Sequence, residues 1–150
     1  MIFERINRSD PEKIFIAVFN SYSVALSNGQ AVIWDFPTDA DGVGVTRPTA
    51  RATNAGVAIA GVAIETIGIS EYGLIQVYGY HAAVRMRTMT SNTVLIVAGT
   101  PLALNAAGSV FCLESWDTGS TNIQVHSCGF ALAANSLFTT SAIAAFLKCL

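Results

Sequence analysis

The chain has 150 residues, which is enough for one domain with a hydrophobic core. Hydrophobic residues make up 52% of it and charged residues 12%, against about 25% charged in a typical soluble domain. The formal net charge of −2 gives no general attraction to nucleic acid, so no nucleic-acid partner is expected. Residues 52–150 hold only seven charged side chains, too few to cover a monomer's surface, which predicts that other chains bury part of it.

A membrane-spanning helix needs about 20 consecutive apolar residues. The longest apolar runs, Val57–Ile64 and Val94–Ala98, are shorter and β-branched, so no membrane association is expected. No secretory signal is expected either, because Met1 is followed at once by Ile-Phe-Glu-Arg. Three cysteines without a CxxC pair are typical of free, buried thiols in a reducing cytosol. They are Cys112, Cys128 and Cys149.

In chain order, residues 1–13 are polar and charged and are predicted to form an N-terminal arm, while residues 14–150 are predicted to form a single β domain. Ile14–Phe19 is β-branched and aromatic without helical spacing, which predicts a strand. A turn signal at Ser27-Asn28-Gly29-Gln30 precedes a second predicted strand, Ala31–Phe36, in which apolar positions alternate.

From Pro37 to Asn54 the composition is that of a long loop, with a short strand predicted at Val43–Thr46. The next block, Ala55–Tyr80, carries only two charges, Glu65 and Glu71, and its glycines separate short β-branched and aromatic runs. Such runs predict strands that are buried on both faces.

Leu74–Thr88 is predicted to be a long strand with a break near Gly79. Its odd-numbered positions change from apolar residues to Arg85 and Arg87. We therefore expect this strand to begin in the core and to end at a rim.

The remainder of the chain repeats strand and turn about every ten residues. The final apolar segment, residues 141–150, is rich in Ala, and its sequence is compatible with either a helix or a strand. Because no amphipathic helix of any length is indicated, the fold class is predicted to be all-β, a sandwich or a small barrel. Further strands are predicted at residues 93–98, 109–116 and 123–132.

Two sequence patterns resemble ligand-binding loops but fail on spacing. The DxDG of Pro37–Gly42 would need EF-hand carboxylates at Pro37 and Pro48, so a solvated turn is the better interpretation. Gly42-Val43-Gly44 lacks the third glycine and the helix of a dinucleotide site. No cofactor is therefore expected.

Catalytic and metal sites are not expected either. His126 and Cys128 lie two apart on a predicted strand, but nothing supplies the other ligands of a zinc site. A Ser-His-Asp site would have to use His81 or His126, and no GxSxG occurs. The sequence therefore predicts a protein without enzymatic activity.

Cationic and aromatic side chains are the candidates for contact with a partner protein. Arg85 and Arg87 lie on one face of the predicted strand, and the planar guanidinium of Arg suits ion pairs with acidic groups of a partner. An exposed strand end without a partner is an equal alternative. Aromatic residues near strand ends are candidate anchors, although most are expected to belong to the core. The predicted interface comprises Arg5, Arg8, Trp34, Phe36, Arg47, Arg51, Tyr72, Tyr78, Tyr80, Arg85 and Arg87.

Several segments carry a resemblance to a known family. They are the Gly-led turn into AVIWD at residues 31–35, DGVGVTRP at 41–48, AGVAIETIGISEYGLIQVYGYHAAVRM at 60–86, VAGTPL at 97–102, GFALAANS at 129–136 and AFLKCL at 145–150. Through them the chain resembles the small head decoration, or cement, proteins of tailed bacteriophages.

The resemblance implies a compact jelly-roll or related β-barrel, often trimeric, that sits on the outside of the capsid and bridges subunits of the major capsid protein. It implies a location on the virion after assembly in the host cytoplasm. Under it, the apolar strands would join copies of the chain, while the arm with Arg5 and Arg8 and the loop Pro37–Asn54 would hold the capsid.

Two alternatives stay open. One is a tail or fibre β-module that contacts a host receptor, although the chain has no fibrous repeat. The other is a small oligomeric β-barrel hydrolase or nucleotide-binding protein, which would need a pocket of acidic or Ser/His groups formed between subunits.

Overall fold

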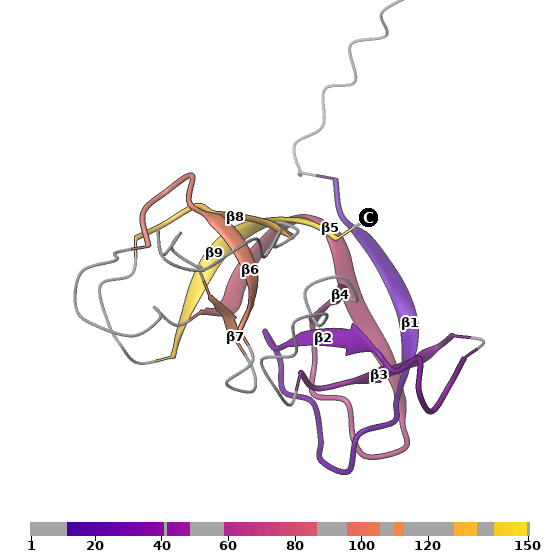
Figure 1. Ribbon diagram of the computed structural model, residues 1–150. Helices are drawn as coiled ribbons and strands as arrows, with labels where there is room; N and C mark the ends of the chain where they lie inside the picture. The colour runs from indigo at the N-terminus through magenta and orange to yellow at the C-terminus, as the bar shows by residue number, and fades with distance from the viewer. Residues whose placement is uncertain are drawn as a thin grey trace, which may run out of the picture.

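The computed structural model describes residues 12–40, 42–48, 59–86, 96–105, 110–112, 128–134 and 140–149 (Figure 1). Within these residues the backbone forms nine strands and no helix, so the predicted all-β class is confirmed. The strands are β1 (Ile14–Asn20), β2 (Ala31–Trp34), β3 (Gly44–Thr46), β4 (Ile59–Ala63), β5 (Tyr72–Met86), β6 (Pro101–Asn105), β7 (Val110–Cys112), β8 (Gly129–Ala131) and β9 (Ser141–Lys148).

The described strands form one mixed sheet in the order β1-β3-β2-β4-β5-β7-β6-β8-β9. β1 and β9, the first and last strands in this order, each pair with β5 as well. Strands β1 to β4 therefore form one circuit with β5, which we call the N-terminal lobe, and β6 to β9 form a second, the C-terminal lobe. Figure 1 shows β5 running through both lobes.

The two halves of β5 have different neighbours. Its first half pairs antiparallel with β1, and its second half, from Tyr78 to Met86, pairs antiparallel with β9. Gly79 lies where the halves meet, with a φ of 97°. A Cβ atom there would collide with the backbone carbonyl of Glu12, which passes close to this point. Glycine therefore allows the strand to bend and the chain before β1 to cross it.

Each lobe has its own hydrophobic core. The N-terminal core includes Val18, Leu26, Ile67 and Ile75, and all four side chains are almost completely buried. The larger C-terminal core also takes Ala31 from β2 and Val62 from β4, so it reaches into the junction between the lobes. Cys149, next to the end of β9, packs against both cores. Full burial of one Leu or Ile side chain stabilises a fold by about 1.5–3 kcal/mol.

The strand predictions agree best with the structure in the first half of the chain. β1, β2, β3 and β5 lie where strands were predicted, and the ambiguous segment 141–150 contains strand β9. β6 begins at Pro101, inside a predicted turn, and was not predicted. Of the predicted strands 109–116 and 123–132, only residues 110–112 and 129–131 are described as strand. Residues 93–95, and the predicted arm up to residue 11, lie outside the described residues.

The prediction for the faces of β5 is wrong beyond His81. A bulge between His81 and Val84 adds one residue to β5 that has no counterpart on β9. Because side chains alternate along a strand, one extra residue exchanges its two faces. Val84 and Met86 are fully buried there, whereas Arg85 is half-buried.

Candidate interaction surface

Among the described side chains of the sheet, the two most exposed large apolar ones, Tyr72 and Phe15, lie on the outer face of the β1–β5 ladder. Phe15, Ala17 and Phe19 of β1 point outward, and Leu74 and Tyr72 of β5 stand opposite Ala17 and Phe19. Tyr72 is 72% exposed, Phe15 42% and Leu74 41%. The rings of Phe19 and Tyr72 lie 5.2 Å apart, so they support each other. We call these five residues the apolar strip.

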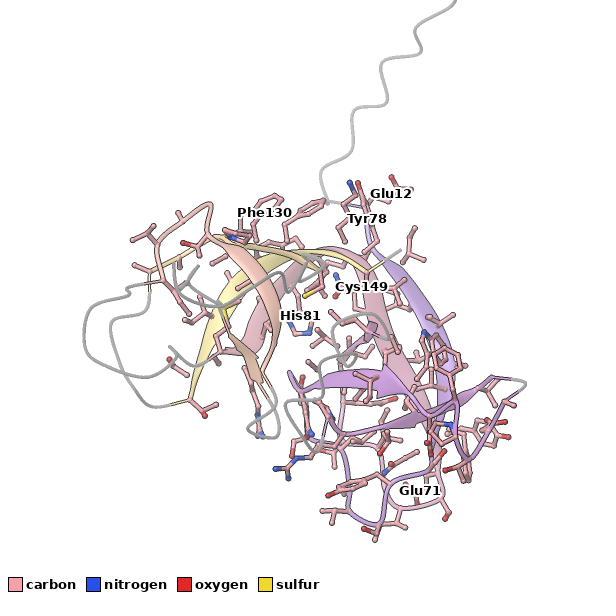
Figure 2. All side chains as sticks on the ribbon, viewed as in Figure 1. Glu12, Glu71, Tyr78, His81, Phe130 and Cys149 are labelled. Atoms are coloured by element: carbon pink, nitrogen blue, oxygen red, sulfur yellow. The ribbon has the colours of Figure 1, made fainter. Side chains whose placement is uncertain are left out.

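A second group of aromatic side chains lies where β5 meets β9 and β8. The ring of Phe146 packs edge-on against Tyr78 and stacks on Phe130, with centroids 5.3 Å apart in both pairs. Phe130 remains 41% exposed. Figure 2 shows Phe130 and Tyr78 on the same side of the molecule. We call Tyr78, Phe130 and Phe146 the aromatic cluster.

Gln76 fixes the backbone between the apolar strip and the aromatic cluster. Its side chain is 2% exposed, and its amide nitrogen donates to the carbonyls of Tyr78 and Tyr80, each 3.0 Å away. The Lys13 ammonium lies 5.9 Å from the centre of the Tyr80 ring, within the range of a cation–π contact. These contacts hold the tyrosines in place, so the surface is built on a fixed framework.

Exposed apolar side chains also occupy the turns of the N-terminal lobe. Phe36, Val43 and Ile69 are about half exposed or more, at 56%, 48% and 56%. The turn that carries Val43 is organised by Asp39, whose carboxylate accepts hydrogen bonds from the backbone N–H groups of Val43 and Gly44. Asp39 thus uses its oxygens to form the turn, which agrees with the interpretation of the DxDG as a turn.

The two predicted arginines that the structure describes are half-buried. The backbone N–H of Arg85 donates to the carbonyl of Gly29, 2.8 Å away, so Arg85 lies against the turn between β1 and β2. The Nε atom of Arg47 is buried without a hydrogen-bond partner in the described part of the chain. The described residues among those predicted to form the interface lie on several strands and turns. Of the remaining predicted residues, Trp34 packs against the N-terminal core, and Arg5, Arg8, Arg51 and Arg87 lie outside the described residues.

His81 is the one histidine in the described segments, and it stabilises the bulge of β5. Its side chain is 8% exposed, and its Nδ1 atom accepts a hydrogen bond from the backbone N–H of Ala83. Burial lowers the pKa of His81, and the nearby positive charge of Lys13 lowers it further. At neutral pH the imidazole is therefore neutral and fixed in one orientation.

The thiol of Cys128 is a poor nucleophile. Cys128 is 2% exposed, and its Sγ atom donates to the carbonyl of Leu102, 3.2 Å away. Burial raises the pKa of Cys128, and a hydrogen bond with Cys149 raises it further. Only a thiolate reacts readily, so Cys128 acts as a packing residue. His126, which the sequence places two residues from Cys128, and the side chain of Cys112 lie outside the described residues.

Within the described residues, no group of three or more His, Cys, Asp or Glu side chains could hold a metal ion. No helix in the same ranges has the length and apolarity needed to cross a membrane.

Sequence reasoning missed Phe15, Leu74, Phe130 and Phe146 as surface residues. The run Ile14–Phe19 is apolar at every position, so alternation could not show which face is exposed. The contact of Phe130 with Phe146 depends on the pairing of β8 with β9, which no local pattern encodes.

No protein-family model matches the chain, and the search of curated proteins found no significant relative.

Proposed function

We propose that this protein is a virion structural protein of a tailed bacteriophage. It binds the outside of the capsid as a homotrimer and holds neighbouring subunits of the major capsid protein together. It carries no enzymatic activity, requires no cofactor, and is assembled onto the capsid in the host cytoplasm. The proposal rests on the family resemblance described above and on one structural observation, the apolar strip.

The apolar strip has the features of a protein-binding surface. Its large side chains are exposed on paired strands, where little conformational entropy is left to lose on binding. Apolar and aromatic residues at the centre of an interface supply most of its binding energy. The strip carries no charged residue, so a partner meets it without desolvating a charge on this side.

Such a surface can act by mass action alone. A protein that binds the assembled shell and not its free subunits stabilises the shell by about 2.7 kcal/mol per site at a concentration of 100 times its Kd. These contributions add up over the many sites of a capsid. Under this proposal, the apolar strip and the predicted arm of residues 1–13 together make the contacts with neighbouring copies of the chain and with the capsid.

Co-sedimentation with purified capsids of the phage that encodes the chain tests the proposal. The full chain should sediment with capsids in a saturable way and raise the temperature at which they release DNA. A chain lacking residues 1–12 should lose capsid binding and keep its oligomeric state. Failure of the full chain to bind capsids, or undiminished binding by the truncated chain, would contradict this mechanism. Binding to host cells instead of capsids would favour the tail or fibre alternative.

A further inference from the structure

Among the residues that the structure describes, one edge of β1 has a neighbouring strand over only a small part of its length. β1 pairs with β5 from Ile14 to Phe19, but on its other side it pairs with β3 only at Phe19 and Asn20. From Ile14 to Val18 that side has no strand beside it in the described part of the chain. Figure 1 shows β1 at the outside of the N-terminal lobe.

The hydrogen bonds of β1 show which backbone groups face the open side. The N–H of Asn20 donates to Glu71 next to β5, whereas the N–H of Phe19 donates to Val43 next to β3. Because the direction of these groups alternates along a strand, the N–H and C=O groups of Phe15 and Ala17 point the same way as those of Phe19. No strand or turn of the described chain bonds them there.

The side chains of this edge do not protect it. Natural edge strands are usually blocked by charged residues, proline or a bulge in the exposed stretch. Ile14–Phe19 contains no charge and no proline, and Lys13 only flanks it. The one irregularity of its pairing with β5 lies between Ile14 and Phe15, where the extra residue belongs to β5 and not to β1. Ile14 is 41% exposed and Phe15 42%. An edge of this composition is a template for pairing with another strand.

We propose that β1 pairs with the β1 strand of a second copy of this chain, antiparallel and related by a two-fold axis at Ile16. Phe15 of each copy then lies opposite Ala17 of the other, and their N–H and C=O groups form four hydrogen bonds across the axis. The contact uses the whole open stretch and ends where β3 begins. The proposal rests on the proposed function, because it names the edge through which copies of the decoration protein meet.

A second copy fits this edge better than an unrelated peptide does. The open stretch is self-complementary, since its outward-facing groups at Phe15 and Ala17 satisfy each other in the antiparallel register. The large Phe15 side chain meets the small Ala17, and no charged residue of one copy faces a like charge of the other. A two-fold contact cannot close a trimer, so in the proposed homotrimer it joins one trimer to the next.

A cysteine introduced at the axis tests the geometry. In the proposed pairing the two Ile16 residues are opposite each other, with Cα atoms about 4.5 Å apart, close enough for a disulfide after substitution. Mild oxidation of the Ile16→Cys chain by oxidised glutathione, which takes up the two electrons, should give a covalent dimer. Peptide mapping should place the bond between the introduced thiols of the two copies. Leu74→Cys is the control, because Leu74 is as exposed as Phe15 but lies on the neighbouring strand. Absence of a bond between the introduced thiols, or equal dimer yield from the control, would overturn the pairing.

Sedimentation equilibrium tests the hydrogen bonds. Ala17→Pro removes an N–H from each copy, while the bonds of β1 to β5 come from Ile16 and Val18. The full chain should self-associate, and Ala17→Pro should weaken its association by about tenfold or more, whereas Ala17→Val should not. Thermal unfolding of each variant confirms that it is folded.

The capsid assay separates the two proposals. Unchanged self-association of Ala17→Pro with loss of capsid binding would overturn the pairing with a second copy and indicate a capsid-protein strand on this edge. A chain that pairs through β1 but does not bind capsids would refute the proposed function and leave the pairing intact.

Discussion

The backbone N–H of Ala83 donates a hydrogen bond to the Nδ1 atom of His81, 3.1 Å away, inside the bulge of β5. The bond requires an unprotonated Nδ1, so it places the imidazole proton on Nε2. Protonation of the ring would replace this acceptor with a second donor and break the bond. The bulge in the second half of β5, where it pairs with β9, is therefore sensitive to acid.

We expect the free energy of unfolding to fall as the pH is lowered. The pKa of His81 is below its ordinary value of 6.5 in the folded chain, because of burial first and of Lys13 second. The unfolded chain therefore takes up the proton first, so the stabilisation is complete above pH 6.5 and is lost as the pH falls towards the folded pKa. The loss is at most about 1.4 kcal/mol per pH unit.

Thermal unfolding between about pH 7.5 and pH 5, a range that spans the ordinary pKa of histidine, measures this effect. His81→Gln, which does not titrate, should flatten the dependence of Tm on pH in this range. An equally steep dependence in the variant would assign the acid sensitivity to other groups.

Gly79→Ala should destabilise the fold strongly. The new Cβ would collide with the backbone carbonyl of Glu12 and would also be held at a φ of 97°. We expect a loss of about 3 kcal/mol or more in urea unfolding. Gly99 is the matched control, with a φ of 89° and nothing within 4 Å of an added Cβ. Gly99→Ala should cost only about 1–2 kcal/mol, and equal losses would show that the crossing chain is not the cause.

Asn20 should be essential for the turns at the end of the N-terminal lobe. Its fully buried amide donates to the carbonyls of Val24, Ile67 and Gly68, at 3.1, 3.2 and 2.9 Å. Asn20→Ala leaves these buried acceptors without their donor, which should cost about 2–3 kcal/mol.

The charge of an aspartate at the same position gives a sharper test. Asn20→Asp should cost more than Asn20→Ala, because it turns carboxylate oxygens towards carbonyl oxygens. Asn28→Ala, at an exposed position, should change the free energy of unfolding by less than about 0.5 kcal/mol. A smaller loss for the aspartate than for the alanine would contradict the hydrogen-bond assignment.

Alkylation should distinguish the two described thiols. Cys128 is buried and its pKa is raised, first by burial, whereas Cys149 is partly exposed. Iodoacetamide at about pH 8 should modify Cys149 before Cys128, as followed by peptide mass spectrometry. In denaturant the two rates should become similar. Early modification of Cys128 in the folded chain would show that the C-terminal lobe opens easily.

The all-β class could be read from the sequence because turn residues and β-branched runs are local signals. Strands β1, β2, β3 and β5 follow from such runs. Strand β6 was missed because its first residue, Pro101, is a turn residue by composition, and a prolyl nitrogen is tolerated at the start of a strand. The face of Arg85 was misassigned because a bulge depends on the pairing of β5 with β9.

The interaction surface was predictable only in part. Tyr72 is an aromatic residue near a predicted strand end, which made it a candidate, and it is the most exposed of the large apolar residues in the described chain. Phe15 and Leu74 face solvent because β1 pairs with β5 in one particular register, although the two strands lie far apart in the sequence. That register is a property of the tertiary structure, so alternation within either segment could not reveal it.

The shared strand β5 makes the two lobes one cooperative unit. Each lobe needs β5 to complete its circuit of paired strands, and the C-terminal core is partly built from Ala31 and Val62 of the other lobe. Neither lobe can therefore be excised, exchanged or replaced as a module, although each has a separate core. A duplication or fusion that adds to this protein would have to leave β5 uninterrupted, and the chain should melt in a single transition.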